Sequence, residues 1–439
     1  MLRLKPQSPD LWDSILPEEL RKLSEELEHV NSILDDNKLM DPFVKRFSTT
    51  MGRPSIPVAT YVRLMYLKFR YKLGYETLVA EVSDSIHWRR FCGIGLQEKV
   101  PDSTALIKLT HKYGEDVLKE IHGLIIENLK NRKLVRGKKI RVDTTVVESD
   151  IHYPTDPTLL RDGLRRLRQS ISKVHNIGLR IGRTLKKAKS LTFSVSQLLR
   201  KPDKRSRNKI KAINHAIIRL THTSIDKVKK VLNSIRDRRI SRDIARTIEV
   251  TETIARQSEE RLSGTKPENR IVSLADPGAR PIVKGKLDKP VEFGRTAQIT
   301  QDASGYITQY GVFQGNPSES TMVPGILKKH QDQFPGQLKS IAADTAFASE
   351  ENFDLLSDAG LTRIGIPARG KPPPDVRLKQ SRVWFRLLRN FRAGIEATIR
   401  FLDRKFGFKR SMYRGNSGTF IWVSWAVIAA NLYRFSKGP

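Results

Sequence analysis

The chain has 439 residues, 38% of them hydrophobic and 29% charged. It is long enough for roughly two or three domains with folded cores, and this composition excludes wholesale disorder. Its 80 Lys and Arg against 47 Asp and Glu give a formal net charge of +33, which excludes an ordinary metabolic enzyme and favours a polyanionic partner, nucleic acid above all.

The apolar runs and the cysteine count indicate the cellular location and the kinds of site to expect. No run reaches the roughly 18 residues of a membrane-spanning helix. The longest, residues 420–432, is interrupted by Ser424 and Asn431. The first six residues contain no apolar signal core. The one cysteine, Cys92, excludes an intramolecular disulfide and a Cys-based zinc site. We therefore expect a cytoplasmic protein without a membrane partner.

Residues 1–135 are expected to be helical. Apolar spacing and turn residues predict short helices over residues 58–73, 75–82, 85–92, 104–113 and 115–130. Ser103 is the predicted cap of the fourth helix, and Gly114 separates it from the fifth. The series resembles a helix-turn-helix arrangement, in which Arg89, Arg90 or Lys108 reaches DNA. A plain helical bundle with solvated arginines fits the pattern equally well.

The next segment, residues 137–147, is β-branched and apolar enough to be a largely buried strand. Asp143 stands in its middle. A buried carboxylate is costly unless it is paired or bound to a cation. In so basic a chain, this acid indicates a metal ion held against a polyanion.

A long basic stretch follows the strand. Residues 161–270 contain 30 Lys and Arg and 10 Asp and Glu, so their net charge is 30 − 10 = +20. Helical periodicity, with a break around Lys201-Pro202-Asp203, predicts two or more long helices with few core contacts of their own. A solvated surface is the simpler interpretation of a charge run. The excess exceeds what solubility needs, and therefore favours a clamp on the DNA backbone.

Strand patterns return from about residue 272. Alternation over 290–300 and 306–314, with a turn at 302–305, predicts an antiparallel hairpin. The following predicted elements are a helix over 320–334, a strand over 338–344, a helix capped by Ser349, a strand over 361–366, a linker at 370–374 and helices over 382–406 and 419–435.

Three acids in these elements are candidates for chemistry. Asp143 lies in mid-strand, Asp344 ends a strand and Glu396 lies beside the apolar stripe of a helix. Each has a simpler interpretation alone: an ion pair or loop cap for Asp143, a turn residue for Asp344, and an i,i+4 row with Arg392 and Arg400 for Glu396. Together, three carboxylates suit two hard divalent ions that cleave a phosphodiester.

Several motifs together resemble the bacterial insertion-sequence transposases of the DDE class. Val142-Asp143-Thr144-Thr145, Ala343-Asp344-Thr345-Ala346-Phe347 and Arg392-Ala393-Gly394-Ile395-Glu396 are similar to the regions of the family's three acids. The N-terminal residues that are similar to the family's helical domain are Gly52-Arg53-Pro54-Ser55-Ile56-Pro57, Gly74-Tyr75-Glu76-Thr77-Leu78, Glu81-Val82-Ser83-Asp84-Ser85 and Trp88-Arg89-Arg90-Phe91.

The chain departs from the related signature on the last acid's helix. That signature has Tyr, Arg, Glu and Lys, with two, three and six residues between them. Arg392 and Glu396 fit, but Arg389 stands at the tyrosine position and Asp403 at the lysine position. Arg404 or Lys405 is the candidate replacement for that lysine. The first two acids are also 344 − 143 = 201 residues apart, which the basic helical insertion accounts for.

The resemblance implies an α/β fold: a ribonuclease H-like mixed sheet, interrupted by a large basic helical insertion and preceded by an all-α DNA-binding domain. The expected parts are residues 1–135 for the N-terminal domain, 136–156 and 276–439 for the catalytic domain, and 157–275 for the insertion.

It also implies a function. Asp143, Asp344 and Glu396 would be both catalytic residues and ligands of two Mg²⁺ (or Mn²⁺) ions, and Arg392, Arg53, Arg89, Arg90 and Lys108 would bind DNA. The expected partners are element-end and target double-stranded DNA and further copies of the chain, in a bacterial, nucleoid-associated setting. A nuclease of the same fold without strand transfer, and an inactive transposase-derived DNA-binding protein, are the alternatives.

Overall fold

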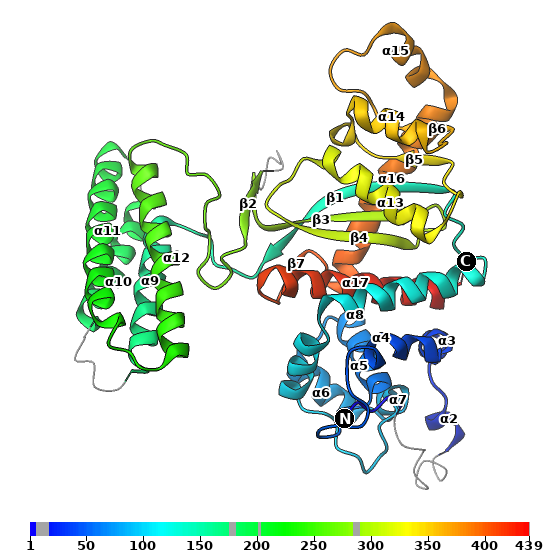
Figure 1. The fold of residues 1–439 in the computed structure, drawn as a ribbon, viewed down its shortest axis with the longest axis horizontal. Helices are drawn as coiled ribbons and strands as arrows, with labels where there is room; N and C mark the ends of the chain where they lie inside the picture. Colours follow the sequence, from blue (N-terminus) through cyan, green and yellow to red (C-terminus); the bar gives the residue numbers. More distant parts are fainter. Residues whose placement is uncertain (6–16, 175–180, 201–202, 284–289, 439) are drawn as a thin grey trace. The chain divides into compact units, whose positions relative to one another are not determined.

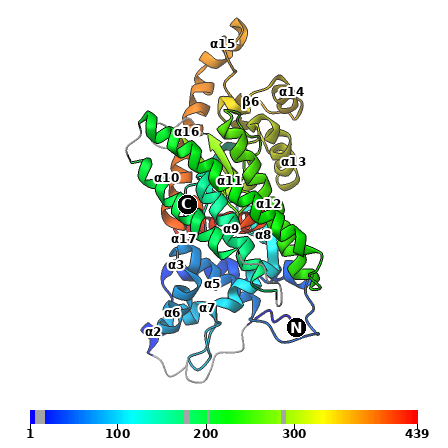
Figure 2. The same ribbon diagram turned by 90° about the vertical axis from the view of Figure 1, so that its left-hand side faces the viewer.

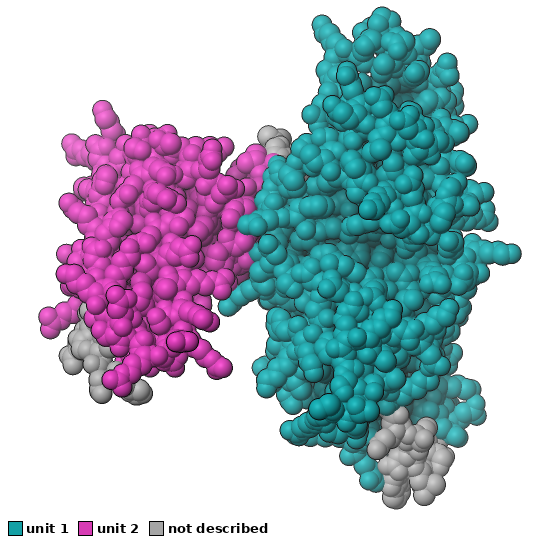
Figure 3. All heavy atoms as spheres, in the orientation of Figure 1, with its two compact units in different colours: residues 1–148, 295–439 teal, residues 149–294 magenta. Residues whose placement is uncertain are grey.

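The computed structural model describes residues 1–5, 17–174, 181–200, 203–283 and 290–438, and has the mixed α/β architecture that the sequence predicts. Its contacts divide the chain into two compact units (Figures 1 and 3). Unit 1 comprises residues 1–148 and 295–439, and unit 2 comprises residues 149–294.

The N-terminal part of unit 1 is helical, as expected. Its elements are α2 (Glu18–Arg21), α3 (Glu25–Leu34), the 3-10 helix η1 (Asn37–Met40), α4 (Asp41–Val44), α5 (Val58–Arg70), α6 (Tyr75–Asp84), α7 (Ile86–Cys92) and α8 (Ser103–Asn131). The cap of α8 is Asp102, which accepts from the Ala105 amide, so the prediction of Ser103 as the cap was wrong by one residue. Gly114 breaks α8 with a φ of 72°, which confirms the predicted break.

The sheet consists of β1 (Lys139–Ser149), β2 (Arg280–Val283), β3 (Val291–Asp302), β4 (Ile307–Gln314), β5 (Ser340–Ala342), β6 (Arg363–Gly365) and β7 (Arg410–Ser411). The strand order is β2-β3-β1-β5-β6, with β4 paired to β3 and β7 to β1. The hairpin β3–β4 is antiparallel, as predicted, whereas β5 runs parallel to both β1 and β6. The sheet is therefore mixed.

The remaining elements of unit 1 are the 3-10 helices η2 (Glu319–Met322) and η3 (Thr345–Phe347) and the helices α13 (Val323–Gln333), α14 (Glu350–Asp358), α15 (Pro374–Ser381), α16 (Val383–Phe406) and α17 (Gly415–Ser436). Ser349 caps α14 as predicted, by accepting from the Asn352 amide. The sequence analysis missed α15, which begins at the last proline of the predicted linker. No helix of the described residues is long and apolar enough to cross a membrane.

Helix α17 and the N-terminal helices share one hydrophobic core with the hairpin. Helix α17, which carries the fully buried Trp425, packs against α3, α5 and α8 (Figure 1). Ile307 of β4 lies at the junction, where its amide donates to Asn431 of α17 at 2.9 Å. His122 of α8 bonds the Ile307 carbonyl through Nε2, also at 2.9 Å. These bonds satisfy the buried backbone of β4 and fix both helices to the sheet.

This buried histidine makes the stability of unit 1 sensitive to acid. Burial lowers the pKa of His122 to about 4. Between that value and the unfolded pKa of about 6.5, the unfolded state is protonated and the folded state is not, so stability falls as the pH falls through this window. The upper limit of the loss is about 3 kcal/mol.

The prediction is tested by chemical denaturation of the protein and of His122→Gln at pH 7 and pH 4.5. The glutamine retains a donor for the Ile307 carbonyl and does not titrate. Its free energy of unfolding should therefore decline less over this range than that of the unsubstituted protein. Equal declines would contradict the assignment, because the other titrating groups are common to both proteins.

Unit 2 contains the helices α9 (Asp156–Ile171), α10 (Gly182–Leu198), α11 (Lys204–Leu232) and α12 (Arg238–Leu262), which run side by side (Figures 1 and 2). Helical structure was predicted here, but the expectation of few core contacts was wrong. Buried Leu, Ile, Val and Ala side chains from all four helices form three clusters inside the bundle. Each helix therefore buries its own apolar stripe against its neighbours.

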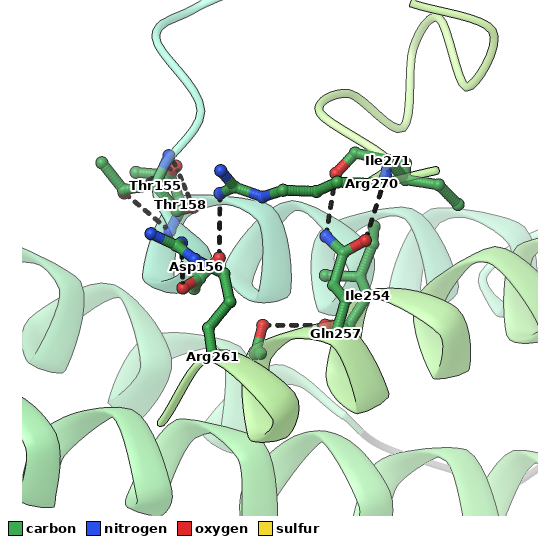
Figure 4. Close-up of polar contacts among 9 residues, drawn as sticks. Thr155, Asp156, Thr158, Ile254, Gln257, Arg261, Arg270 and Ile271 are labelled. Carbon is green, nitrogen blue, oxygen red and sulfur yellow. Dashed lines mark hydrogen bonds and ion pairs between the residues drawn. The ribbon is translucent and has the colours of Figure 1, made fainter. Parts of the chain in front are cut away.

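A polar cluster joins the chain segment that enters this bundle to the segment that leaves it (Figure 4). Asp156, at the start of α9, accepts from Arg261 of α12 and from Arg270, which follows α12. The side chain of Gln257 holds both backbone groups of Ile271, at 2.8 and 3.0 Å. These bonds hold the segment that enters unit 2 beside the segment that leaves it.

Candidate active site

Of the predicted acids, Asp143 lies on β1, and Asp344 lies two residues beyond the end of the parallel strand β5. The register of β1 with β5 pairs Lys139 with Ser340 and Arg141 with Ala342. Two residues further along, this register places Asp143 beside Asp344. Ligands of open α/β sheets bind at this end of parallel strands. The structure therefore brings together two acids that are 201 residues apart in the sequence.

Local hydrogen bonds orient both carboxylates. Asp143 is 7% exposed, and its Oδ1 accepts from the Thr144 amide at 2.8 Å. Asp344 is the cap of η3, and its Oδ1 accepts from the Ala346 amide at 2.8 Å. In each case one oxygen is engaged by the backbone and the other, Oδ2, is turned towards α16.

Arg392 of α16 lies at the centre of the predicted acids. Its Nη2 contacts Asp143 Oδ2 at 3.0 Å and Asp344 Oδ2 at 3.5 Å, and its Nη1 contacts Glu396 Oε1 at 3.4 Å. One guanidinium thus touches all three carboxylates. Among the described residues, no three His, Cys, Asp or Glu side chains are already arranged to hold a metal ion.

Burial perturbs the carboxyl group of Asp143. It raises the pKa of Asp143 to about 6, although the charge of Arg392 and the bond from Thr144 act in the opposite direction. Asp344 and Glu319 add smaller upward contributions. A carboxyl whose pKa is raised by a dry, acid-rich setting is typical of a functional site. A divalent cation would relieve the same repulsion.

Glu319 is a fourth acid, which the sequence analysis missed. It begins η2, after the hairpin, and accepts a hydrogen bond from the Thr144 hydroxyl. Nothing in its local sequence distinguishes it from a surface glutamate, and only the folding of η2 against β1 brings it to the site. It holds Thr144, the residue next to Asp143.

A cleft of about 530 Å³ opens beside Asp344. Three arginines of α16 line it, namely Arg386, Arg389 and Arg392. Arg389 is the residue that stands where the related signature has tyrosine. The cleft therefore combines a carboxylate with three guanidinium groups, which bind phosphate oxygens by charge-assisted hydrogen bonds.

Helix α16 is fixed to the sheet by a close contact at Gly394. The Nη1 of Arg141, on β1, donates to the Phe391 carbonyl at 2.7 Å, and its Nε donates to Gln301 at 2.8 Å. A Cβ atom at residue 394 would lie 2.1 Å from the same Nη1. The group that approaches this glycine is therefore a side chain of β1.

The predicted DNA contacts of the N-terminal helices differ in their surroundings. Arg89 is 8% exposed and donates to the carbonyls of Gly95, Leu96 and Glu98, so its guanidinium holds the loop after α7. Lys108 and Arg53 are exposed, and Arg90 is half-buried. The structure does not bring these residues to the acids. Because the Arg89 side chain is buried, it is not available to contact DNA.

Asp403 has a structural contact near the end of α16. Its Oδ1 accepts from the Lys409 amide at 3.2 Å, across the turn that leads to β7. The acid at the position where a lysine was expected therefore supports this turn. This contact gives a reason for an acid here without involving the cleft.

Paired acids at the end of parallel strands, with an arginine-lined cleft beside them, suit an enzyme that processes nucleic acids. Comparison with known families agrees. Residues 16–112 match the family model described as Transposase domain (DUF772), and residues 277–432 match the Transposase DDE domain. The chain belongs to the insertion-sequence DDE transposases.

One curated relative is known only as "Uncharacterized protein ORF8 in nfe locus" of Rhizobium meliloti. It is 30% identical over 139 residues, which cover 30% of this chain and 67% of the relative. No solved structure matches the chain. The family-model matches carry the assignment, since the relative's name states no activity.

Proposed function

We propose that the chain binds the terminal inverted repeats of its element and catalyses metal-dependent strand cleavage and strand transfer. The observation that supports this most directly is that Asp143 on β1 and Asp344 just after the parallel strand β5 contact the same guanidinium, that of Arg392, which also contacts Glu396. The strand order β2-β3-β1-β5-β6, with β4 antiparallel to β3 and with β5 parallel to both β1 and β6, supports a ribonuclease H-like catalytic domain.

The carboxylates fit two divalent ions by their chemistry. Mg²⁺ and Mn²⁺ prefer carboxylate oxygens, and the Oδ2 atoms of Asp143 and Asp344 face the same guanidinium and so the same small volume. Asp143, Asp344 and Glu396 would hold the ions. When bound, such ions activate the attacking oxygen and stabilise the leaving oxygen of a phosphodiester.

The arginines of α16 would position the DNA. On occupation of the carboxylates, Arg392 would give up its contacts and neutralise a phosphate, together with Arg386 and Arg389 of the same cleft. Arg53, Arg90 and Lys108 would add contacts from the N-terminal domain. The proposed domain limits remain residues 1–135, 136–156, 157–275 and 276–439, and the active form would be an oligomer on DNA in the bacterial cytoplasm.

The carboxylates are tested by replacing each with its amide. Asp143→Asn, Asp344→Asn and Glu396→Gln keep the volume and remove the charge that binds the ions. Each should lower Mg²⁺-dependent cleavage of duplexes from the element ends on the order of 1,000-fold. Asp354→Asn, at an exposed position of α14, is the matched control and should cleave normally.

Full activity of Asp143→Asn or Asp344→Asn would refute the assignment. The same assay separates strand transfer from simple hydrolysis. Joined products with a target duplex would support a transposase, whereas free cleaved ends alone would indicate a nuclease of the same fold. No cleavage by the unsubstituted protein would indicate an inactive descendant.

A further inference from the structure

The positive charge of unit 2 is concentrated on one side of its bundle. Helix α10 carries Arg183, Lys186, Lys187 and Lys189 and no acidic residue. The first half of α11, residues 204–219, carries only cations as well. They are Lys204, Arg205, Arg207, Lys209, Lys211 and Arg219. All ten of these side chains are exposed.

Helix α12 has a different balance. It contains six arginines and five acids, so its net charge is 6 − 5 = +1. Three of its five acids make contacts within the bundle. Glu252 pairs with Lys229 at 2.5 Å, Glu259 contacts His222 at 2.9 Å, and Asp243 accepts from Ser170 at 2.9 Å. On α9, Asp162 likewise contacts both Arg161 and Arg165.

Helices α10 and α12 lie on opposite sides of the bundle. Helix α10 packs on α9 and α11, and α12 packs on the same two helices, so α10 and α12 occupy opposite corners. On α10, the buried residues Leu185, Ala188, Thr192 and Val195 define the inner face. Arg183, Lys186 and Lys187 project from the opposite face, because helical positions three to four residues apart align.

The cations of α10 are free to meet an external anion. Within the part of the chain that the structure describes, none of the four forms an ion pair with an acidic side chain. The nearest acid in sequence, Asp203, caps α11 by accepting from the Ser206 amide. A surface at one corner that carries cations and no acid is more than uniform solubility requires, whereas α12 at the opposite corner mixes its arginines with five acids.

We propose that the face of α10 and the first half of α11 is a binding surface for the phosphate backbone of double-stranded DNA, and that the α12 face is not. The choice of DNA over other polyanions rests on the proposed function. The contact would be independent of sequence, because contacts of Lys and Arg with phosphates position DNA and carry no sequence information directly. It would hold DNA through unit 2, separately from the acids of unit 1.

The test compares two charge reversals of equal size in the full chain. Arg183→Glu, Lys186→Glu and Lys187→Glu together alter the α10 face. Arg239→Glu, Arg242→Glu and Arg246→Glu together alter α12, where these exposed arginines also form no ion pair among the described residues. The probe is a labelled duplex of random sequence without metal, titrated at several salt concentrations.

Each lost phosphate contact lowers the slope of log affinity against log salt by about 0.9. The α10 variant should therefore lose about 2 to 3 from the slope and bind roughly 10- to 100-fold more weakly at about 0.1 M salt. The α12 variant should retain the slope of the unsubstituted protein. Circular dichroism and thermal unfolding establish that both variants are folded. If the α10 variant does not fold, the single substitutions Lys186→Glu and Lys187→Glu are compared with Arg242→Glu in the same way.

Equal losses in the two triple variants, or no loss in the α10 variant, would overturn the proposal. Tighter binding of the protein to vesicles containing phosphatidylserine, or to duplex RNA, than to the DNA probe would also overturn it. Because the probe is neither cleaved nor an element end, a failure of catalysis leaves this result unaffected. The proposed function and this surface therefore fail in distinguishable ways.

Discussion

Replacing Gly394 by alanine is expected to destabilise the catalytic unit and to reduce strand cleavage severely. The added Cβ would lie 2.1 Å from Nη1 of Arg141. That guanidinium can move away only by breaking its hydrogen bonds to Phe391 O and Gln301, at 2.7 and 2.8 Å. Overpacking of this kind costs about 1–3 kcal/mol of folding free energy.

Activity should fall further than stability alone explains. Gly394 lies between Arg392 and Glu396, so any shift of α16 that relieves the clash also moves these two side chains away from Asp143 and Asp344. A displacement of about 1 Å at a reacting centre lowers rates about 100-fold. The measurements are the free energy of unfolding in urea and the single-turnover cleavage rate at saturating DNA.

Two controls separate the clash from a general effect of alanine. Gly123→Ala lies within α8, where an added Cβ has no neighbour within 4 Å, and should be neutral or slightly stabilising. Combining Gly394→Ala with Arg141→Ala removes the opposing group, so the double variant should be more stable than the sum of the single effects predicts. Strict additivity, or a Gly394→Ala protein with normal stability and rate, would contradict the close-contact argument.

The sequence predicted the elements of the site better than their arrangement. Asp143, Asp344 and the Glu396 helix could be located because periodicity and turn residues depend on neighbours along the chain. The register that sets Asp143 beside Asp344 is a contact across 201 residues and leaves no local signal. Glu319 could not be found for the same reason, since only the folding of η2 against β1 gives it a role.

Two predictions about the fold, for the core of unit 2 and for the segment that forms α15, were wrong for similar physical reasons. The helices of unit 2 were expected to have few core contacts of their own. Buried apolar side chains from all four helices nevertheless form three clusters, because the apolar stripes face one another in the bundle. Helix α15 was missed because consecutive prolines indicate a linker, although a proline is favourable in the first turn of a helix. Local patterns thus missed what packing determines.

The arginine at the centre of the acids leads to the second large effect. Arg392→Gln removes the cation that contacts Asp143, Asp344 and Glu396 at 3.0, 3.5 and 3.4 Å. Without metal, the carboxylates then repel one another, and the loss of folding free energy should be on the order of 2 kcal/mol. This is below the value for a fully buried pair, because the Glu396 side chain is 58% exposed.

Divalent ions should reverse much of this loss. In the unsubstituted protein an ion must displace Arg392 from the carboxylates, whereas in Arg392→Gln the carboxylates already need a counter-charge. The rise in melting temperature on addition of Mg²⁺ or Mn²⁺ should therefore be larger in the variant, since a ligand stabilises the state that binds it in proportion to its affinity. Strand cleavage should nevertheless be lower, because no guanidinium remains to neutralise the phosphate.

These opposite changes distinguish a dual role from a purely structural ion pair. Arg392→Lys keeps the charge but not the fork that reaches three carboxylates at once, so it should show intermediate metal stabilisation and partial activity. Arg400→Gln, one turn beyond Glu396 on an exposed position of α16, is the matched control and should resemble the unsubstituted protein in both measurements. An unchanged or smaller metal-induced rise in Arg392→Gln would mean that the arginine and the ions do not compete for Asp143 and Asp344, and the ions would then have to bind elsewhere.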